Sequence, residues 1–430
     1  MAGEEKFDAI VVGAGLAGTA AALTMARRGL QTLVVEKGKT PGSKNVTGGR
    51  MYAHALATLL PEFASEAPIE RWVTKEVITL MTKDDAVEIA FDSPKMGAQH
   101  VSFNVLRAKF DPWFAQKAEQ AGALVAADTR VDDLWLEDGK VKGIVTGSDR
   151  FAADCVVLAE GANTLLAEKA GLKGPPDPSK LSVGVKEVIA LPAETINDRF
   201  GCGDDEGVAQ VLIGTFTRGV EGGGFLYTNK DSVSLGLVIP LSAGIEGKQP
   251  IYDMIEDMRT HPHLQKLLKG GEMREYSAHM IPERGYAAVP KDLVRDGLVM
   301  VGDTAGLVLN TGLTFRGMDL AIESGRLAGD AVAEAKAKGN YRAEALRAYQ
   351  AKLNESFVMK DLKRFKHASK VIANPRMFTT YPELAAAVFH GLYDIRGEQP
   401  KPSKVVSRAL KKHVSLFALA KDAILGRMAM

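Results

Sequence analysis

Short apolar runs alternate with longer stretches of helical periodicity in two regions of the chain, one at its start and one near residue 300. Residues 9–12 and 32–35 are apolar runs of strand length, and an Ala- and Leu-rich helical pattern separates them. The same order returns at 297–335, where a strand, a loop and a long helical pattern follow one another. Strands that alternate with helices are typical of a parallel sheet covered by helices. The pattern therefore predicts an α/β fold with a Rossmann-like sheet.

Between these parts the periodicity becomes strand-like. Residues 76–91 alternate around a turn at 83–85, and residues 131–145 alternate around Asp138-Gly139, so both predict hairpins. A helix is predicted over 105–122, and further strands over 123–127 and 155–163.

The stretch 181–289 is mostly strand-like, with a helical part near 251–269. Within it, two strands joined by a turn at 229–231 predict an antiparallel pair that would line a pocket. Residues 171–178 have the composition of a linker, and residues 341–430 have helical patterns.

A chain of 430 residues is too long for one simple core, so several structural units are expected. We predict a discontinuous Rossmann-like dinucleotide-binding domain, an inserted antiparallel β-rich substrate domain and a helical C-terminal extension. The predicted ranges are 1–75, 105–178 and 285–340 for the first, 76–104 and 179–284 for the second, and 341–430 for the third.

Composition is that of a soluble globular protein, with 46% hydrophobic and 25% charged residues. Two cysteines, Cys155 and Cys202, exclude a disulfide framework and cannot alone hold zinc or a four-cysteine iron–sulfur cluster. Cys155 lies in an apolar run and is expected to be inert. No apolar run reaches the roughly 18 residues of a membrane span, and the first residues are acidic where a signal peptide is basic. A cytoplasmic protein is expected.

The net charge of +1 hides an asymmetry, because residues 331–430 contain 19 Lys/Arg and 8 Asp/Glu. This basic end is a candidate surface for an anionic partner or a membrane. Six basic residues are expected to crowd one short helix: Lys360, Lys363, Arg364, Lys366, His367 and Lys370. A solvated basic face would have the same pattern. Residues 405–430 place apolar side chains at helical spacing between cations, which fits either an interfacial amphipathic helix or an ordinary packed helix.

The most specific motif is Gly13-Ala14-Gly15-Leu16-Ala17-Gly18, which follows the first strand and opens the first helix. Gly13 allows a tight turn, Gly15 lets the backbone approach a pyrophosphate, and Gly18 lets the helix pack closely on the strand. Glu36 ends the second strand, where a carboxylate bonds a ribose hydroxyl. Together these features predict an adenine-dinucleotide site at the N-terminus of the helix.

Two later segments are expected to converge on the same site. A buried strand stops at Glu160-Gly161, and another strand feeds the loop from Gly302 to Gly306. In open α/β sheets, ligands bind outside the carboxyl ends of the strands. There Asp303 could accept hydrogen bonds from hydroxyls of the ligand.

These motifs, with Arg107 in VLRAKFDPW, resemble the p-hydroxybenzoate-hydroxylase type of FAD fold. Further segments resemble the FixC proteins, relatives of the electron-transfer-flavoprotein:quinone oxidoreductases. Those segments are KNVTGGRMYAH, GVKEV, GGGFLYTN, FRGMDLAI and NPRMFTTYPELA. The resemblance runs from end to end and implies FAD as the cofactor.

By position, the resemblance assigns the pyrophosphate to Gly13, Gly15 and Gly18, and the adenosine ribose to Glu36. It assigns the phosphates to Arg107, the adenine to Val131 and the ribityl chain to Asp303. Gly48, Gly49, Arg50 and the stretch 312–317 would lie near the isoalloxazine, with Arg50 and Arg316 as cations for the reduced flavin or as ordinary ion-paired arginines. The implied site also includes Ala14, Leu16, Ala17, Lys37, Asn45, Gly161, Gly302, Gly306, Gly312 and Leu313.

Other catalytic patterns are missing from the sequence. There is no second GxGxxG after a strand, so a nicotinamide domain is not expected, and no Ser/His/Asp or Cys/His arrangement suggests covalent catalysis. His261 and His263 flank a proline without a third ligand, so we expect no metal. His54 and His279 would line the pocket or serve as structural histidines. No catalytic residue is assigned, and no nucleic-acid partner is expected.

The resemblance implies electron transfer from an electron-transfer flavoprotein of the FixA/FixB type, through FAD, to a quinone. The wider family has a C-terminal iron–sulfur module whose four cysteines this chain lacks, which implies a separate ferredoxin-like subunit. Quinone as acceptor favours peripheral contact with the inner face of the cytoplasmic membrane. Nitrogen fixation and carnitine metabolism are both settings of the family.

Two alternatives remain open at this point. One is a flavin-dependent reductase or monooxygenase of an isoprenoid or aromatic substrate, and the other is a non-catalytic flavoprotein assembly subunit.

Overall fold

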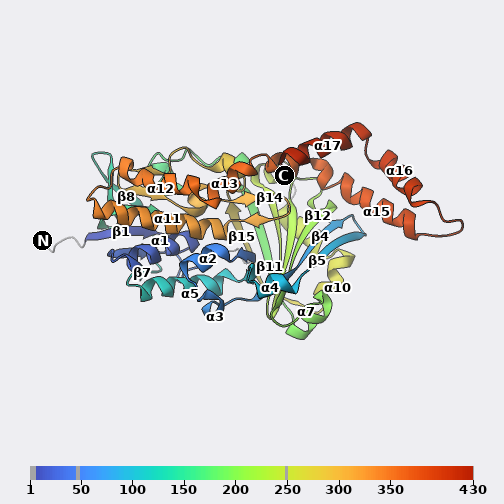
Figure 1. The fold of residues 1–430 in the computed structure, drawn as a ribbon, viewed down its shortest axis with the longest axis horizontal. Coiled ribbons are helices and arrows are strands. Elements are labelled where there is room, and N and C mark those ends of the chain that lie inside the picture. The colour runs from blue at the N-terminus through green and yellow to red at the C-terminus, as the bar shows by residue number, and fades with distance from the viewer. Residues whose placement is uncertain (1–5, 45–48, 247–249, 430) are drawn as a thin grey trace.

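A computed structural model describes residues 6–44, 49–246 and 250–429. The molecule is elongated, with a helix-covered parallel sheet in one half and a fan-shaped second sheet in the other (Figure 1). Helices from the end of the chain run along one side and project beyond the second sheet (Figure 1). The predicted fold class is therefore confirmed.

The first sheet has a parallel centre in the order β17-β10-β1-β2-β7. Its middle strand is apolar, and Ala9, Ile10 and Val11 are fully buried, as expected where helices cover both faces of a parallel sheet. Short β16 and the hairpin β8–β9 add antiparallel pairs. The strands are β1 (Lys6–Val12), β2 (Thr32–Val35), β7 (Leu124–Ala126), β8 (Asp133–Glu137), β9 (Lys140–Thr146), β10 (Asp149–Leu158), β16 (Val294–Arg295) and β17 (Leu298–Met300).

Helices α1 (Leu16–Arg27) and α11 (Met318–Ala337) pack side by side on this sheet (Figure 1). Small residues let their backbones come close: a Cβ added at Gly325 would lie 2.0 Å from the carbonyl oxygen of Ala17. Helix α5 (Arg107–Gln120) packs against α1 and ends before Gly122, as predicted.

The second sheet has the order β15-β11-β14-β13-β12-β4-β6-β3, with β5 paired to β4. Both predicted hairpin pairs in it, β4–β5 and β13–β14, are present. The strands are β3 (Gly49–Tyr52), β4 (Arg71–Met81), β5 (Ala86–Asp92), β6 (Ser102–Val105), β11 (Ser182–Ala190), β12 (Glu206–Gly214), β13 (Gly223–Thr228), β14 (Ser232–Pro240) and β15 (Glu272–Ile281).

One face of this sheet is covered by helices whose apolar residues form a second buried cluster. They are α7 (Ala193–Phe200), α9 (Ile251–Arg259) and α10 (Pro262–Leu268). Helix α6 (Leu165–Lys169) lies between the last long strand of the first sheet and β11 of the second. The other short helices connect or follow strands of the second sheet: α2 (His54–Leu59), α3 (Phe63–Glu66), α4 (Pro94–Ala98) and α8 (Leu241–Glu246).

The structure differs from the predicted strands in three places. Strand β10 ends at Leu158 rather than 163, because Gly161 turns the chain with φ of +77°. Residues 49–52 and 71–75 belong to the second sheet, although the predicted division placed them with the first. The second sheet is also not wholly antiparallel, since β12 pairs in parallel with β4.

The C-terminal region is helical, as predicted, but two stretches that were expected to be single helices are interrupted. The six basic residues from Lys360 to Lys370 do not share one helix: Lys360, Lys363 and Arg364 are in α13, Lys370 is in α14, and the other two lie in the turn between them. Residues 405–430 do not form one helix, because Val414 is extended (φ −144°, ψ 136°) and separates α16 from α17. The helices are α12 (Ala343–Glu355), α13 (Phe357–Arg364), α14 (Ala368–Ile372), α15 (Thr380–Tyr393), α16 (Pro402–His413) and α17 (Leu416–Ala429).

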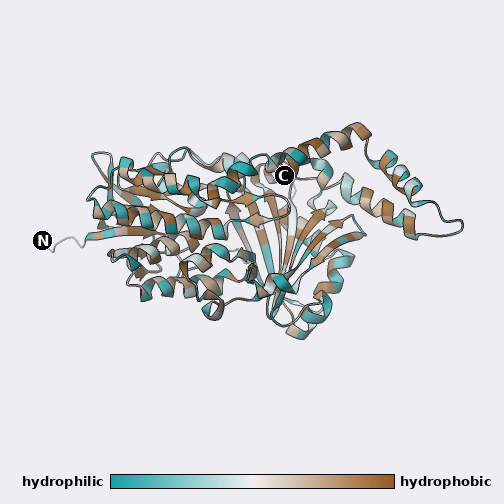
Figure 2. Ribbon diagram, in the orientation of Figure 1, coloured by the Kyte–Doolittle hydropathy of each residue, from teal (hydrophilic) through white to brown (hydrophobic). Residues whose placement is uncertain are grey.

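Helices α15 and α16 project away from the second sheet as an arm, and α17 returns from it (Figures 1 and 2). Large apolar side chains lie exposed near the bend between α16 and α17: Leu416 is 76% and Phe417 is 82% exposed. Among the helices in the described ranges, none is long and apolar enough to cross a membrane.

The close packing of α1 on α11 predicts the effect of a methyl group. Gly325→Ala should lower the free energy of unfolding by about 1–3 kcal/mol, because the added Cβ meets backbone that cannot move away. Gly426→Ala in α17 is the matched control. Open space surrounds Gly426, so this substitution should raise the free energy of unfolding by about 0.5–1 kcal/mol. Denaturant midpoints measure both, and equal shifts would contradict the packing argument.

Candidate functional site

A cavity of about 1070 Å³ extends from the carboxyl ends of the parallel strands to the second sheet. Its walls come from the ends of β1 and β2, from the segments that follow β10 and β17, and from β12 and β13 of the second sheet. Small-molecule sites usually measure about 300–1,000 Å³, so this cavity has room for a large ligand.

Backbone forms the wall at the start of α1. Gly13 has φ of +103°, and a Cβ there would lie 2.4 Å from the carbonyl oxygen of Ala159. At Gly18 a Cβ would lie 1.9 Å from the oxygen of Gly13. These contacts confirm the tight turn and the close packing that the motif predicts. Gly15 caps α1, whose first turn has neither an acidic residue nor a side-chain cap, so its positive end faces the cavity.

Glu36 is 8% exposed at the end of β2 and lines the cavity. Its carboxylate accepts hydrogen bonds from the backbone N–H groups of Ala14 (2.9 Å) and Gly38 (2.6 Å). It therefore ties the glycine loop to the loop that follows β2. Its contact with a ribose remains a prediction.

Cations gather near the same end of the cavity. Arg107 is buried and bonds Asp111 through two nitrogens, at 2.5 and 2.7 Å. Lys37 and His279 also line the cavity. Burial lowers the pKa of His279, and the charges of Lys37 and Arg107 lower it further. An anionic group placed here would find a positive environment.

The three predicted segments do meet at this cavity. The hydroxyl of Thr304 donates to the carbonyl oxygen of Gly161 at 3.1 Å and so joins the second segment to the third. Asp303 lines the cavity, and burial raises its pKa to about 6, although Arg107 and Lys173 act in the opposite direction. Burial also raises the pKa of Glu160, which accepts bonds from two backbone N–H groups at the start of α6.

Most of the predicted cofactor residues line the cavity: Gly13, Gly15, Leu16, Ala17, Glu36, Lys37, Gly49, Arg50, Arg107, Val131, Gly161, Asp303, Gly312 and Leu313. Ala14, Gly18, Gly302 and Gly306 are not among the lining residues. Gly302 and Gly306 instead allow close packing, since their added Cβ atoms would lie 2.7 Å from the Cβ of Ala17 and 2.5 Å from the oxygen of Ala288. Asn45 and Gly48 lie outside the described residues.

Arg50 faces the cavity from β3. It forms an ion pair with Glu76, donates to the hydroxyl of Ser102 at 2.9 Å, and stacks on the ring of Tyr52 at 4.3 Å. Burial raises the pKa of Glu76, and the charge of Arg50 opposes that rise. Arg50 is thus an ion-paired arginine that also borders the cavity.

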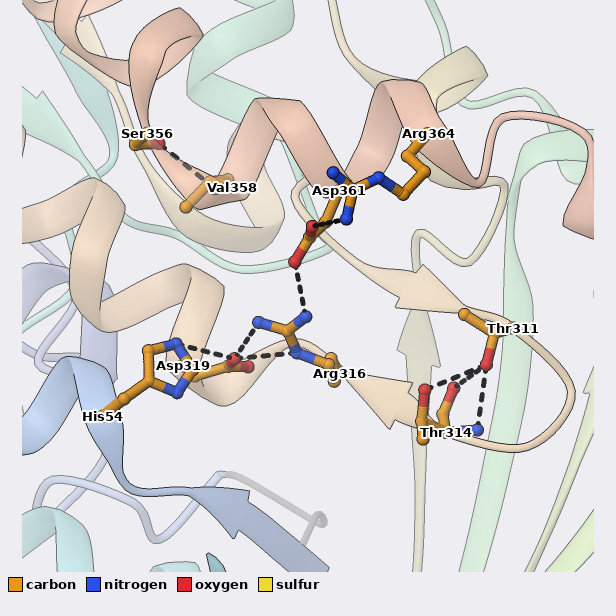
Figure 3. Close-up of polar contacts among 9 residues, drawn as sticks. All are labelled: His54, Thr311, Thr314, Arg316, Asp319, Ser356, Val358, Asp361 and Arg364. Atoms are coloured by element: carbon orange, nitrogen blue, oxygen red, sulfur yellow. Dashed lines mark hydrogen bonds and ion pairs between the residues drawn. The ribbon is translucent and has the colours of Figure 1, made fainter. Parts of the chain in front are cut away.

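Arg316 is not among the residues that line the first cavity, and its contacts are those of the ion-paired alternative, so its role at the flavin stays a prediction. Its guanidinium bonds Asp319 at 2.5 and 2.9 Å and Asp361 at 2.7 Å, as Figure 3 shows. It lines a second cavity of about 600 Å³ instead of the first. Residues 309–316 form the short hairpin β18 (Leu309–Asn310) and β19 (Phe315–Arg316), which borders both cavities.

His54 belongs to this second cavity too, whereas His279 lines the first. Its Nε2 lies 3.6 Å from Asp319 (Figure 3), and its ring meets Phe357 edge-on at 4.6 Å. Burial lowers the pKa of His54, and Asp319 opposes this. Among the described residues, no group of three or more His, Cys, Asp or Glu side chains could hold a metal.

The sequence did not indicate the far end of the first cavity. There the lining residues are largely apolar and come from widely separated segments: Val308, Leu309, Phe365, Ile372, Met377 and Phe378. Two carboxyl groups, Glu221 and Glu283, border the cavity as well. No local motif marks these positions, because only the C-terminal helices bring them together.

The lining and the length of the cavity fit FAD. A backbone wall and a helix N-terminus suit a pyrophosphate, and nearby cations balance its charge. Asp303 and Glu36 offer carboxylates for hydroxyl groups. The space beyond the glycine loop continues to the second sheet, as an extended dinucleotide with a large ring requires.

Comparisons with known protein families agree with this geometry. Models of FAD dependent oxidoreductases match residues 8–173 and 104–331. A model of the ETF-QO/FixC family C-terminal domain matches residues 368–430.

Two similar proteins cover nearly the whole chain. The first is the probable electron transfer flavoprotein-quinone oxidoreductase YdiS of Escherichia coli (strain K12), 45% identical over 99% of this chain and 100% of that protein. The second is Protein FixC of Salmonella typhi, 43% identical over 98% of this chain and 99% of that protein. These matches confirm the resemblance that the sequence motifs indicate.

Solved structures share the fold at low identity. A geranylgeranyl bacteriochlorophyll reductase-like protein (Ta0516) from Thermoplasma acidophilum superposes with a TM-score of 0.71 at 20% identity, over 98% of this chain and 100% of that one. The flavin-dependent brominase Bmp2 gives a TM-score of 0.63 at 15% identity, over 98% and 97%. With the family models, they confirm an FAD-binding oxidoreductase fold.

The second cavity yields a prediction about buried charge. Asp319 is 1% exposed, so Arg316→Gln should lower the free energy of unfolding by about 3–5 kcal/mol by leaving that carboxylate without its guanidinium. Arg364→Gln is the control, because Arg364 is 68% exposed and 3.8 Å from Asp361, and it should change stability by less than about 0.5 kcal/mol.

Urea denaturation of the purified variants measures both effects. Adding Asp319→Asn to Arg316→Gln should recover much of the loss, since it removes the unpaired charge. A double variant no more stable than Arg316→Gln would contradict this account.

Proposed function

The chain belongs to the ETF-QO/FixC family of FAD-dependent electron-transfer oxidoreductases, and from that premise we propose that it passes electrons from an electron-transfer flavoprotein of the FixA/FixB type, through FAD, to a quinone. The observation that carries the proposal is the first cavity, which has a polar dinucleotide end and an apolar end against the C-terminal helices. An apolar quinone ring suits the second end.

Bound FAD would supply electron exchange in single or paired steps, which joins a one-electron protein carrier to a two-electron acceptor. The chain's own residues would hold the cofactor and exclude water. The glycine loop and α1 would hold the pyrophosphate, with Arg107 and Lys37 as its cations. Arg50, bound to Glu76, would place a positive charge beside the ring system.

The arm formed by α15, α16 and α17 supports contact with a membrane surface. Exposed Leu416 and Phe417 lie at the bend, and basic residues flank them: Arg408, Lys411, Lys412, Lys421 and Arg427. Apolar side chains among cations suit the interface of an anionic bilayer. Helix α17 packs against α14, whose Ile372 lines the apolar end of the cavity. A quinone would therefore enter from the membrane side.

A ferredoxin-like subunit is the remaining partner in this proposal. The two cysteines of the chain, Cys155 and Cys202, are too few for a four-cysteine cluster. The exposed basic residues Lys363 and Arg364 at the end of α13, and Lys366 in the turn that follows, offer a surface for an acidic redox partner.

Rapid mixing tests the direction of electron flow. Anaerobic addition of reduced electron-transfer flavoprotein should bleach the flavin absorbance of this protein near about 450 nm. A soluble short-chain quinone added next should restore the absorbance. Flavin that stays oxidised with the reduced partner would contradict the proposal and favour an assembly subunit. Reduction by NAD(P)H with an isoprenoid or aromatic substrate would favour a reductase or monooxygenase.

Vesicle flotation tests the membrane surface. Leu416→Ser with Phe417→Ser should reduce binding to vesicles that contain phosphatidylglycerol by at least about tenfold, because two exposed apolar anchors are lost. The control pair Ile89→Ser with Phe91→Ser alters side chains that are 63% and 60% exposed on β5, outside the bend between α16 and α17. If both pairs bind alike, the arm is not the membrane contact.

A further inference from the structure

Reduction of a quinone needs protons as well as electrons. Each of its two carbonyl oxygens takes up one electron and one proton to become a hydroxyl. The apolar end of the first cavity is lined by side chains such as Ile372, Met377 and Phe378, which offer no proton to a quinone oxygen. A protonated side chain in that wall would therefore have to supply the protons.

Several carboxyl groups that border the cavity have partners at the dinucleotide end or beside Arg50. Glu36 accepts from two backbone N–H groups, Glu160 accepts from two others, and Glu76 is paired with Arg50. Asp303 stands in the turn at the dinucleotide end, where Arg107 and Lys173 act on it. Asp132 accepts from the backbone N–H of Gly147 at 2.8 Å, and Glu168 accepts from the hydroxyl of Thr164 at 3.3 Å. Glu283 differs in its place, because it bonds Asn310 of the hairpin between the two cavities, and Glu221 pairs with Arg284, the residue next to Glu283.

Glu283 follows β15 and is joined to the hairpin between the cavities. The side-chain amide of Asn310 donates to its carboxyl, and the Asn310 amide oxygen accepts from the backbone N–H of Gly312 at 2.7 Å. This second bond fixes the orientation of the amide, because only its oxygen can accept from an N–H. Glu283 is thus positioned beside Gly312 and Leu313, which line the same cavity.

The surroundings of Glu283 favour its neutral carboxyl form, mainly because the group is buried. Burial raises its pKa, and the carboxylate of Glu221 acts in the same direction. Hydrogen bonds from Asn310 and Ser182 and the charge of Arg284 oppose this. Arg284, however, is engaged with Glu221 at 3.2 Å and with the carbonyl oxygen of Ser179 at 2.6 Å. Burial raises the pKa of Glu221 as well.

We propose that Glu283 is the catalytic acid that protonates the quinone, and that Glu221 returns protons to it from solvent. In each half of the reaction the quinone gains one electron and one proton. The proton comes from Glu283: the O–H bond of its carboxyl group breaks, and a new O–H bond forms on a quinone oxygen. Glu283 is then reprotonated through Glu221, and the second half repeats the transfer. Two electrons and two protons thus give the quinol. This inference rests on the proposed function.

Glu283→Gln tests it, because glutamine keeps an oxygen for the Asn310 amide but carries no acidic proton. FAD content and reduction by electron-transfer flavoprotein should stay at wild-type levels. Oxidation of the reduced protein by a short-chain ubiquinone should slow by about 100-fold. In the wild type this rate should fall as pH rises through the pKa of Glu283, and the variant should lack that fall.

Glu272→Gln is the matched control, since Glu272 is an exposed carboxyl at the start of β15, the strand that Glu283 follows, and is paired only with surface Arg274 among the described ion pairs. Its rates should equal those of the wild type. Glu283→Asp, which keeps an acid, should recover part of the rate. A Glu283→Gln protein with wild-type rate and pH profile would overturn the proposal.

An infrared titration of the FAD-free protein gives a readout that does not depend on turnover. The protonated-carboxyl band near neutral pH should be equally intense in the wild type and in Glu272→Gln and weaker in Glu283→Gln, because other buried carboxyls such as Asp303 can contribute to it. A wild type that quinone cannot oxidise, with Glu283→Gln still weakening the band, would contradict the proposed function. A band equally intense in the wild type and in Glu283→Gln, with normal quinone oxidation, would contradict only the role of Glu283.

Discussion

The structure depends on a wall of bare backbone where the parallel strands end. A pyrophosphate can approach the N-terminus of a helix only where no side chain intervenes. Gly13 meets this requirement with φ of +103° and with no space for a Cβ beside Ala159. Gly18 and Gly325 also have no space for a Cβ, because α1 must lie against both β1 and α11. The position of the cavity follows from these close contacts.

Charge is distributed around that wall in a consistent way. Positive groups lie at the dinucleotide end, where an anionic ligand would be bound, and carboxylates nearby are held by N–H donors or arginines. The apolar end is lined mainly by hydrophobic side chains, with Lys366 and Ser369 among them, and Glu283 is joined to it through Asn310. The hairpin 309–316 lies between the two cavities, and the buried Arg316 pair anchors it from the second one.

Local patterns predicted the parts of the fold that depend on local physics. The glycine motif, the turn at Asp138-Gly139 and the antiparallel pair around 229–231 were predictable, since φ and side-chain alternation determine them. Contacts between distant segments were not. The bond from Arg316 to Asp361, the parallel pairing of β12 with β4, and the apolar end of the cavity all depend on how the C-terminal helices and the second sheet assemble.

The central claim is that one FAD lies noncovalently in the cavity formed by the glycine motif, Glu160-Gly161 and the loop at Asp303. Titration of the FAD-free protein with FAD, followed by calorimetry and by the visible spectrum, measures this most directly. The account predicts one FAD per chain and strong binding that weakens when Gly13 is replaced by Val, because that side chain would occupy the wall. A folded protein that binds no FAD, or binds it equally well with Val at that position, would contradict the account.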